Sequence, residues 1–259
     1  MFETAQAIVA SRAASSDGRM PMSFQPFVLG NGLSAWALLK STLGTQQAAF
    51  RTNYVTQSDT QYFKGRFADL STPDDIASDR RLLRVVLGAY GLSDDIESRH
   101  FIKTVMSEGV SDPSALANKL SDRRYRALAQ DFDFSKSPPG HKAIAGLAQR
   151  TVDNYLAQSF EIEIGKSDAD MRLALGFKRS LTDVAGTAGS NATAWFQILA
   201  TPPLREVMQK ALGLPTEFSK LDIDVQHERM MDKASLFYGS NEVTDLAGDP
   251  MAGAVTRRF

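Results

Sequence analysis

Two acid–histidine pairs are the residues of this sequence whose spacing could support chemistry. Each pair places an acid three positions before a histidine: Glu97 and His100, and Asp224 and His227. On a helix this spacing puts a carboxylate and an imidazole on one face, as in helical bundles that bind two iron ions. Such a centre also needs carboxylates from two other helices, and Glu161 and Glu163 are the positional candidates. The pairs define one hypothesis, a metal-dependent enzyme built inside a helical bundle.

A structural explanation of the same pairs is simpler. Both acids fall in the first turns of expected helices, where the helix dipole favours negative charge. Gly30, Gly32 and Ala35 fit a G-x-G-x-x-A dinucleotide pattern, but the chain around them lacks the βαβ unit that such a site requires. We interpret them as a turn that leads into a helix. We therefore expect no metal and no cofactor.

Covalent catalysis has no candidate nucleophile here. The sequence contains no cysteine, and no G-x-S-x-G motif marks a serine nucleophile. We predict no catalytic residue and favour a binding role over an enzymatic one.

The motif Ser-Asp-Arg-Arg occurs twice and supplies the candidate binding residues. It lies at 78–81 and again at 121–124, so the candidates are Arg80, Arg81, Arg123 and Arg124. Paired guanidinium groups can bind an anion or an acidic protein partner. Alternatively, they are first-turn surface residues that pair with nearby Asp and Glu.

Each copy of the motif opens an apolar run with helical periodicity. When Gly91 is aligned with Gly213, the apolar positions of the first run recur in a third, looser copy, with the i, i+3, i+4, i+7 spacing of one helix face. Asp79, Asp122 and Thr201 are the predicted N-caps of the three helices. The two glycines are predicted to end the first and third helices in a left-handed conformation. A short amphipathic helix is therefore used more than once.

The rest of the chain predicts an all-α fold, a compact multi-helix domain of short helices. Strand-like alternation is not sustained anywhere in the sequence. We predict four regions: 1–53, a partly helical N-terminal extension; 54–136, a first helical repeat region; 137–238, a second helical region packed on the first; and 239–259, an irregular tail. Pro138-Pro139-Gly140 marks the main internal break, and His141 after it is expected to be a solvated loop residue. The Gly-, Ala- and Thr-rich stretch 182–191 is expected to be a loop.

Composition restricts the partners. With 29 Lys and Arg against 30 Asp and Glu, the chain has no net charge that would favour nucleic acid. No apolar run approaches the roughly 18 residues of a transmembrane helix, and the first residues do not resemble a cleaved secretory signal. At 259 residues and 43% hydrophobic, the chain can bury a substantial core.

Several segments resemble a family of unknown function found in alphaproteobacteria. They are 78–83, 89–92, 117–125 and 211–215, with Met230-Met231, and 117–125 is the most specific. The resemblance covers about residues 54–235. It implies an all-helical fold and brings no catalytic residue. Members are often encoded beside flagellar genes, so the resemblance also implies a flagellar association.

Together these observations favour a non-enzymatic interaction or accessory protein with a protein partner, and the resemblance implies a flagellar component as that partner. We expect it to be cytoplasmic, or flagellum-associated without a cleavable signal peptide. The alternative is the metal-dependent bundle enzyme.

Overall fold

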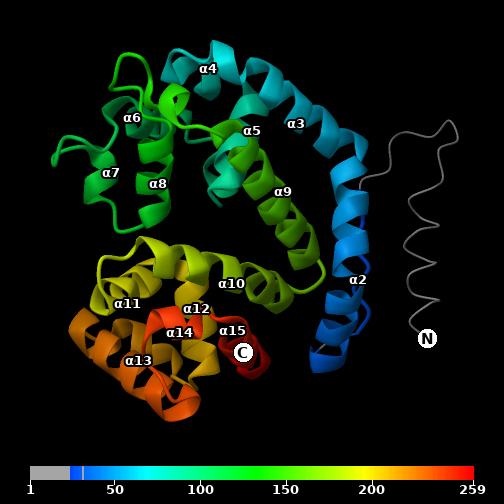
Figure 1. The fold of residues 1–259 in the computed structure, drawn as a ribbon, viewed down its shortest axis with the longest axis vertical. Coiled ribbons are helices and arrows are strands. Elements are labelled where there is room, and N and C mark those ends of the chain that lie inside the picture. The colour runs from blue at the N-terminus through cyan, green and yellow to red at the C-terminus, as the bar shows by residue number, and fades with distance from the viewer. Residues whose placement is uncertain (1–23, 31) are drawn as a thin grey trace, which may run out of the picture. The chain divides into compact units, whose positions relative to one another are not determined.

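Every regular element in the computed structural model is a helix, across the residues that it describes, 24–30 and 32–259 (Figure 1). The all-α prediction is confirmed. Residues 1–23, part of the predicted N-terminal extension, lie outside the described residues. The chain divides into two compact units, Met1–Ser167 and Asp168–Phe259. The predicted break at 138–140 therefore lies inside unit 1.

Unit 1 is organised around α5. Its α-helices are α2 (Gly32–Thr52), α3 (Tyr54–Arg66), α4 (Pro73–Ala77), α5 (Arg80–Ala89), α6 (Arg99–Glu108), α7 (Leu116–Lys119), α8 (Arg123–Asp131) and α9 (Leu147–Gly165). Three 3-10 turns are η1 (Phe67–Asp69), η2 (Ser93–Asp95) and η3 (Gly140–Ala143). Helix α5 packs against α3, α4 and α9. Its residues 82, 83 and 85–89 are all buried.

Helices α5 and α9 approach each other closely. A Cβ added to Gly88 would lie 2.7 Å from the ring of Tyr155, closer than any real Cβ contact. The missing side chain at Gly88 is therefore what lets the Tyr155 ring lie against α5.

Side-chain caps fix the starts of three short helices of unit 1, α4, α5 and α8. The Asp79 carboxylate accepts hydrogen bonds from the N–H groups of Arg81 and Leu82 at the start of α5, and Asp122 accepts one from Arg124 at the start of α8. Thr72 and Asp75 form a reciprocal capping box before α4. These caps satisfy first-turn N–H groups that have no partner within the helix.

Unit 2 has its own apolar core. Its elements are α10 (Ala169–Thr187), α11 (Asn191–Ala200), α12 (Pro202–Ala211), the 3-10 turn η4 (Thr216–Lys220), α13 (Ile223–Tyr238), α14 (Val243–Leu246) and α15 (Asp249–Arg258). Helix α10 packs against α11, α12, α14 and α15. Phe177, Trp195 and Phe218 are among the buried residues that join these helices.

Two expectations for this half of the chain differ from the structure. Most of the expected loop at 182–191 is helical, because α10 continues to Thr187 and buries Leu181 and Val184 in the core. The tail expected to be irregular contains α14 and α15, which bury Leu246 and Val255 in the same core. In both cases, burial outweighs a weak local pattern.

The third copy of the repeat matches the first in packing but not in capping. Leu204, Val207 and Met208 of α12 are buried, as are their aligned residues in α5. Thr201 is the N-cap residue of α12, as predicted, but its side chain makes no cap hydrogen bond. Its hydroxyl instead donates to the carbonyl of Gln197 in the preceding helix at 2.8 Å.

None of the helices in the described part of the chain combines the length and the hydropathy needed to span a membrane.

Candidate functional site

Arg81 belongs to an ion-pair cluster between α3 and α5. Its Nε lies 3.1 Å from Oδ1 of Asp59, and Arg84 NH1 lies 2.8 Å from Oδ2 of the same carboxylate. The Asp59 side chain is only 5% exposed. Two guanidinium groups therefore neutralise one buried carboxylate, which would otherwise be costly to bury.

The same guanidinium makes further contacts with α3. Arg81 NH2 donates to the hydroxyl of Ser58 at 2.8 Å, and the guanidinium carbon lies 4.2 Å from the ring centre of Tyr62. The Tyr62 hydroxyl in turn donates to Oδ2 of Asp79 at 2.6 Å. The carboxylate that caps α5 is thus also bonded to α3, so Arg81 and Asp79 fix the two helices against each other.

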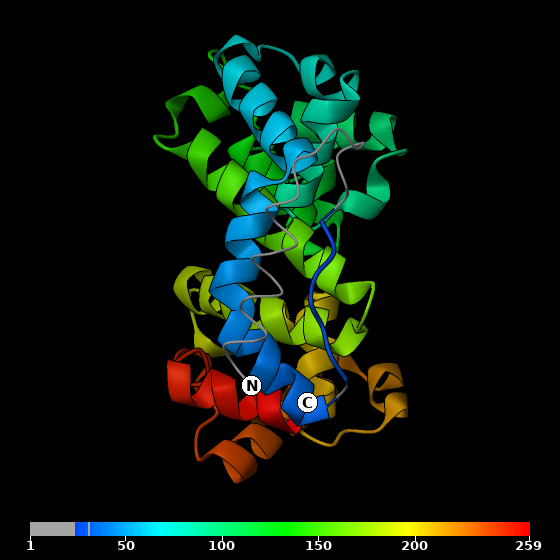
Figure 2. The same ribbon diagram turned by 90° about the vertical axis from the view of Figure 1, so that its right-hand side faces the viewer.

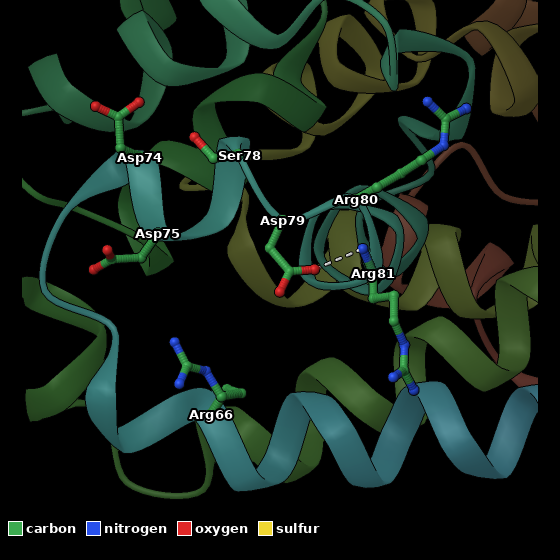
Figure 3. Close-up of a pocket in the computed structure, with 7 residues that line it drawn as sticks. All are labelled: Arg66, Asp74, Asp75, Ser78, Asp79, Arg80 and Arg81. Atoms are coloured by element: carbon green, nitrogen blue, oxygen red, sulfur yellow. Dashed lines mark hydrogen bonds between the residues drawn. The ribbon is translucent and has the colours of Figure 1, made fainter.

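An open hollow lies beside the start of α5 (Figure 3). It is lined by Arg66, Asp74, Asp75, Ser78, Asp79, Arg80 and Arg81. Arg66 points from α3 toward the opening, whereas Arg80 points away from it and Arg81 points toward α3 (Figure 3). Three cations and three carboxylates line this hollow, so it carries no excess of positive charge for an anion.

Arg80 pairs with a residue on the surface of unit 1. Its NH2 lies 2.6 Å from Oε1 of Glu97, and both side chains are at least half exposed. The hydrogen bond from Arg80 lowers the pKa of Glu97. Exposed pairs of this kind contribute little to stability, so Arg80 remains accessible to a competing carboxylate.

The second Arg pair joins α8 to the end of α5. Arg124 NH2 lies 2.7 Å from Oδ2 of Asp122, and NH1 donates to the carbonyl of Gly91. Arg123 is exposed, and no ion pair or hydrogen bond joins it to the residues that the structure describes. Three of the four predicted binding arginines are therefore engaged within unit 1. Binding by this set remains a prediction, with Arg123 as its most accessible member.

The acid–histidine pairs are not arranged as the metal hypothesis requires. Glu97 lies before α6, which begins at Arg99, so the prediction that Glu97 and His100 share a helix face is wrong. Asp224 and His227 are both on α13, but the His227 ring stacks on Phe196 with centroids 4.4 Å apart. In the described ranges 24–30 and 32–259, no three His, Asp or Glu side chains gather closely enough to hold a metal ion.

The two acids proposed to complete a metal centre lie on α9. Glu163 pairs with Lys166 at 2.7 Å, one turn further along the chain. Glu161 lies two residues earlier on the same helix. They therefore come from one helix and not from the two that the hypothesis needs.

His141 is fully buried, so the prediction that it is a solvated loop residue is wrong. Its ring lies in an aromatic box, 5.9 Å from Phe132, 5.1 Å from Phe134 and 5.4 Å from Phe67. Neither ring nitrogen has a hydrogen-bond partner of normal geometry among the described residues. Burial lowers the pKa of His141; Lys142 adds to this shift, and the carbonyl of Leu70 opposes it more weakly.

A second buried polar residue, Asp133, holds the loop that carries His141. Its carboxylate accepts hydrogen bonds from the N–H and the hydroxyl of Ser135 and lies 2.8 Å from Lys136 Nζ. Its carbonyl accepts a hydrogen bond from Gly140 N at 2.6 Å. These contacts fold the Pro138-Pro139-Gly140 segment back onto unit 1, which is the physical reason that it does not separate two regions.

Sequence reasoning did not find Asp59, although a signal was present. Arg81 and Arg84 are one turn apart on a helix that is otherwise almost wholly apolar. Two cations on the same side of such a helix favour a carboxylate on the neighbouring helix that packs there. Which of the acids in the chain supplies it depends on the packing of α3.

The fold and the site define the class of protein. It is an all-α protein in which most of the candidate binding arginines form contacts between parts of unit 1. The chain belongs to the DUF1217 family of proteins of unknown function, whose family model matches residues 89–247. The sequence resemblance to a family of unknown function is thus confirmed.

A solved structure is similar over most of the chain. It is the crystal structure of protein AGR_C_984 from Agrobacterium tumefaciens, an alphaproteobacterium, with 27% sequence identity and a TM-score of 0.68. The match covers 90% of this chain and 95% of that chain. No curated protein matches the chain.

Proposed function

We propose that this chain is a non-enzymatic interaction protein, an accessory of the bacterial flagellum that binds a protein partner through unit 2. The observation that carries the binding role is a surface patch at the end of α13, formed by Lys233, Leu236, Phe237 and Arg258. Leu236 is 74% exposed and Phe237 is 38% exposed. The flagellar part of the proposal rests on the gene neighbourhood that the family resemblance implies.

The α13 patch combines apolar surface with positive charge. The Arg258 guanidinium carbon lies 4.0 Å from the ring centre of Phe237, and Lys233 Nζ lies 5.3 Å from it. Arg258 is held in place because its Nε donates to the carbonyl of Ala211 at 2.9 Å. Aromatic and arginine side chains are enriched where protein partners bind most tightly. An amphipathic helix with acidic residues beside its apolar face fits this patch.

A capture experiment in the native host tests the proposal. We expect tagged native protein to retain flagellar components, and Leu236→Asp with Phe237→Ser to lose most of that capture, because the changes remove the apolar anchor and add a negative charge. Circular dichroism and thermal unfolding check that the variant is folded.

Tyr54→Asp with Val55→Ser is the matched control, since these two residues are also exposed, at 68% and 47%, but belong to unit 1. It should retain capture. Undiminished capture by the α13 variant would refute the binding surface, and a captured set without flagellar components would refute the flagellar role.

A further inference from the structure

Residues 24–29 form an extended segment, here called the arm, that runs alongside α2 (Figure 2). The arm is held through its backbone. Phe27 N donates to Oε1 of Gln46 at 2.7 Å, and Nε2 of Gln46 donates to the carbonyl of Phe27 at 3.0 Å. One side-chain amide thus satisfies both backbone groups of one residue, as a neighbouring β-strand would.

The Gln46 amide is built into unit 1 and is not a surface group. Its side chain is nearly fully buried, and Nε2 also lies 2.9 Å from the hydroxyl of Thr42. A buried amide needs partners for its polar atoms. Gln46 therefore needs an extended backbone beside it. Because it binds only backbone atoms of the arm, the contact does not depend on the side chain at that position.

An aromatic anchor fixes the register of the arm. The Phe24 ring centre lies 5.2 Å from that of Phe50 on α2 and 5.9 Å from that of Phe160 on α9. Between the two contacts, Pro26 restricts the backbone to extended conformations and reduces the entropy lost on docking. The site accepts an extended peptide with an aromatic residue three positions before the residue bonded to Gln46.

Two glycines, Gly30 and Gly32, here called the turn, lie where the arm meets the helix that binds it. Gly30 and Gly32 have φ values of +79° and +65°, which L residues with a Cβ rarely adopt. Leu29 and Leu33, on either side of this turn, are 57% and 63% exposed. Any residue with a Cβ would therefore be strained at these two positions. The apolar side chains on either side of them are exposed to solvent.

We infer that the arm exchanges between two copies of this chain, so that each arm occupies the Gln46 site of the other copy. Every contact of Phe24 and Phe27 is kept in the exchanged pair, and only the conformation of the turn changes. Exchange also brings the two turns together and gives Leu29 and Leu33 apolar neighbours. The inference uses unit 1 alone and is independent of the proposed function.

The hinge variant Gly30→Ala with Gly32→Ala tests the exchange. An added Cβ would meet only Ala35 Cβ, at 4.0 Å from Gly30, and nothing within 4 Å of Gly32, so the change acts on the backbone alone. Because alanine disfavours the left-handed region and the turn is straightened in the exchanged pair, we expect the dimer association constant to rise at least about tenfold. Size-exclusion chromatography with light scattering measures it.

Gly44→Ala with Gly65→Ala is the matched control. Both glycines lie in helices, and neither has an atom within 4 Å of an added Cβ. The same chemical change at these positions leaves the turn untouched, so the association constant should not rise.

Cross-linking identifies which surfaces join the two copies. The chain has no cysteine, so each substitution introduces a single thiol. One copy carries Val28→Cys, next to Phe27 on the arm. The other copy carries Gln47→Cys, next to Gln46 on α2. A short bis-maleimide should join the two copies covalently when they are mixed in the hinge background. Adding Phe24→Ala to both kinds of copy should abolish both the dimer and the cross-link.

A folded hinge variant that stays monomeric would overturn the inference. A dimer that forms without the cross-link, or that survives Phe24→Ala, would also overturn it, because the copies would then associate through another surface. If the hinge variant does not fold, the same cross-link is measured between native-hinge copies at high concentration, where its formation supports exchange and its failure refutes it.

Discussion

Asp59 shows how a single residue can change the interpretation of a sequence motif. The repeated arginines suggest a binding patch when only the sequence around them is considered. In the structure, one buried carboxylate engages Arg81 and Arg84 at 3.1 and 2.8 Å and turns them toward α3. The charge of Arg81 is thus neutralised inside unit 1, whereas Arg123 in the second copy remains exposed.

The burial of His141 leads to a prediction about how the free energy of unfolding depends on pH. Its pKa is lowered from 6.5 by burial, so the unfolded chain takes up a proton before the folded chain as the pH falls. The stabilising effect of the neutral form is complete above about pH 6.5 and is lost as the pH falls toward the folded pKa. We expect the free energy of unfolding to decrease between about pH 7.5 and about pH 5.

Urea unfolding of His141→Phe over the same pH range checks this expectation. The phenylalanine variant should lose less stability on acidification, because no imidazole has to stay neutral inside the aromatic box. His100→Phe, at an exposed position, is the control and should keep the native pH dependence. Identical pH profiles for native protein and His141→Phe would contradict the prediction.

At the scale of elements, the repeat is one helix used in different surroundings. Helices α5 and α12 bury corresponding apolar positions and are followed by glycines with φ values of +70° and +63°. The surroundings of the two glycines differ. A Cβ at Gly91 would lie 2.7 Å from Oε1 of Gln158, whereas a Cβ at Gly213 would meet nothing within 4 Å.

This difference predicts unequal costs for the same substitution. Gly213→Ala should destabilise unit 2 by about 1–2 kcal/mol, the cost of a left-handed alanine. Gly91→Ala should destabilise unit 1 by about 2–3 kcal/mol, because it also displaces Gln158 and weakens the hydrogen bond from its amide to the Ala89 carbonyl. Urea unfolding, monitored for the transition of each unit, measures both. Equal losses would show that Gln158 moves aside without cost.

At the scale of the whole molecule, the division after Ser167 separates two sets of contacts. The buried cluster that begins with Phe177 and ends with Val255 is drawn from unit 2 alone. Asn191 and Trp195 both donate to the carbonyl of Asn241, and Asn191 accepts from Val243 N, so the segment before α14 is fixed to α11 within the same unit. Unit 2 therefore has a buried core of its own, and the hydrogen bonds that fix the segment before α14 are made within it.

We predict that a fragment comprising residues 168–259 folds by itself. It should show a helical circular dichroism spectrum and a cooperative thermal transition, since its core needs no residue from unit 1. The matched fragment 202–259 begins at α12 and lacks α10 and α11, so it should lose both properties. A disordered 168–259 fragment would contradict the prediction.

The sequence by itself determined the all-α class, the caps at Asp79 and Asp122, and the buried face that α5 and α12 share. These features depend on residues within one turn or one helix, where periodicity and capping chemistry act directly. Only the tertiary structure decided that Arg81 faces Asp59, that His141 is enclosed by three phenylalanines, and that the chain divides after Ser167. Those outcomes depend on which distant helices pack together, and many arrangements of amphipathic helices satisfy the same local patterns.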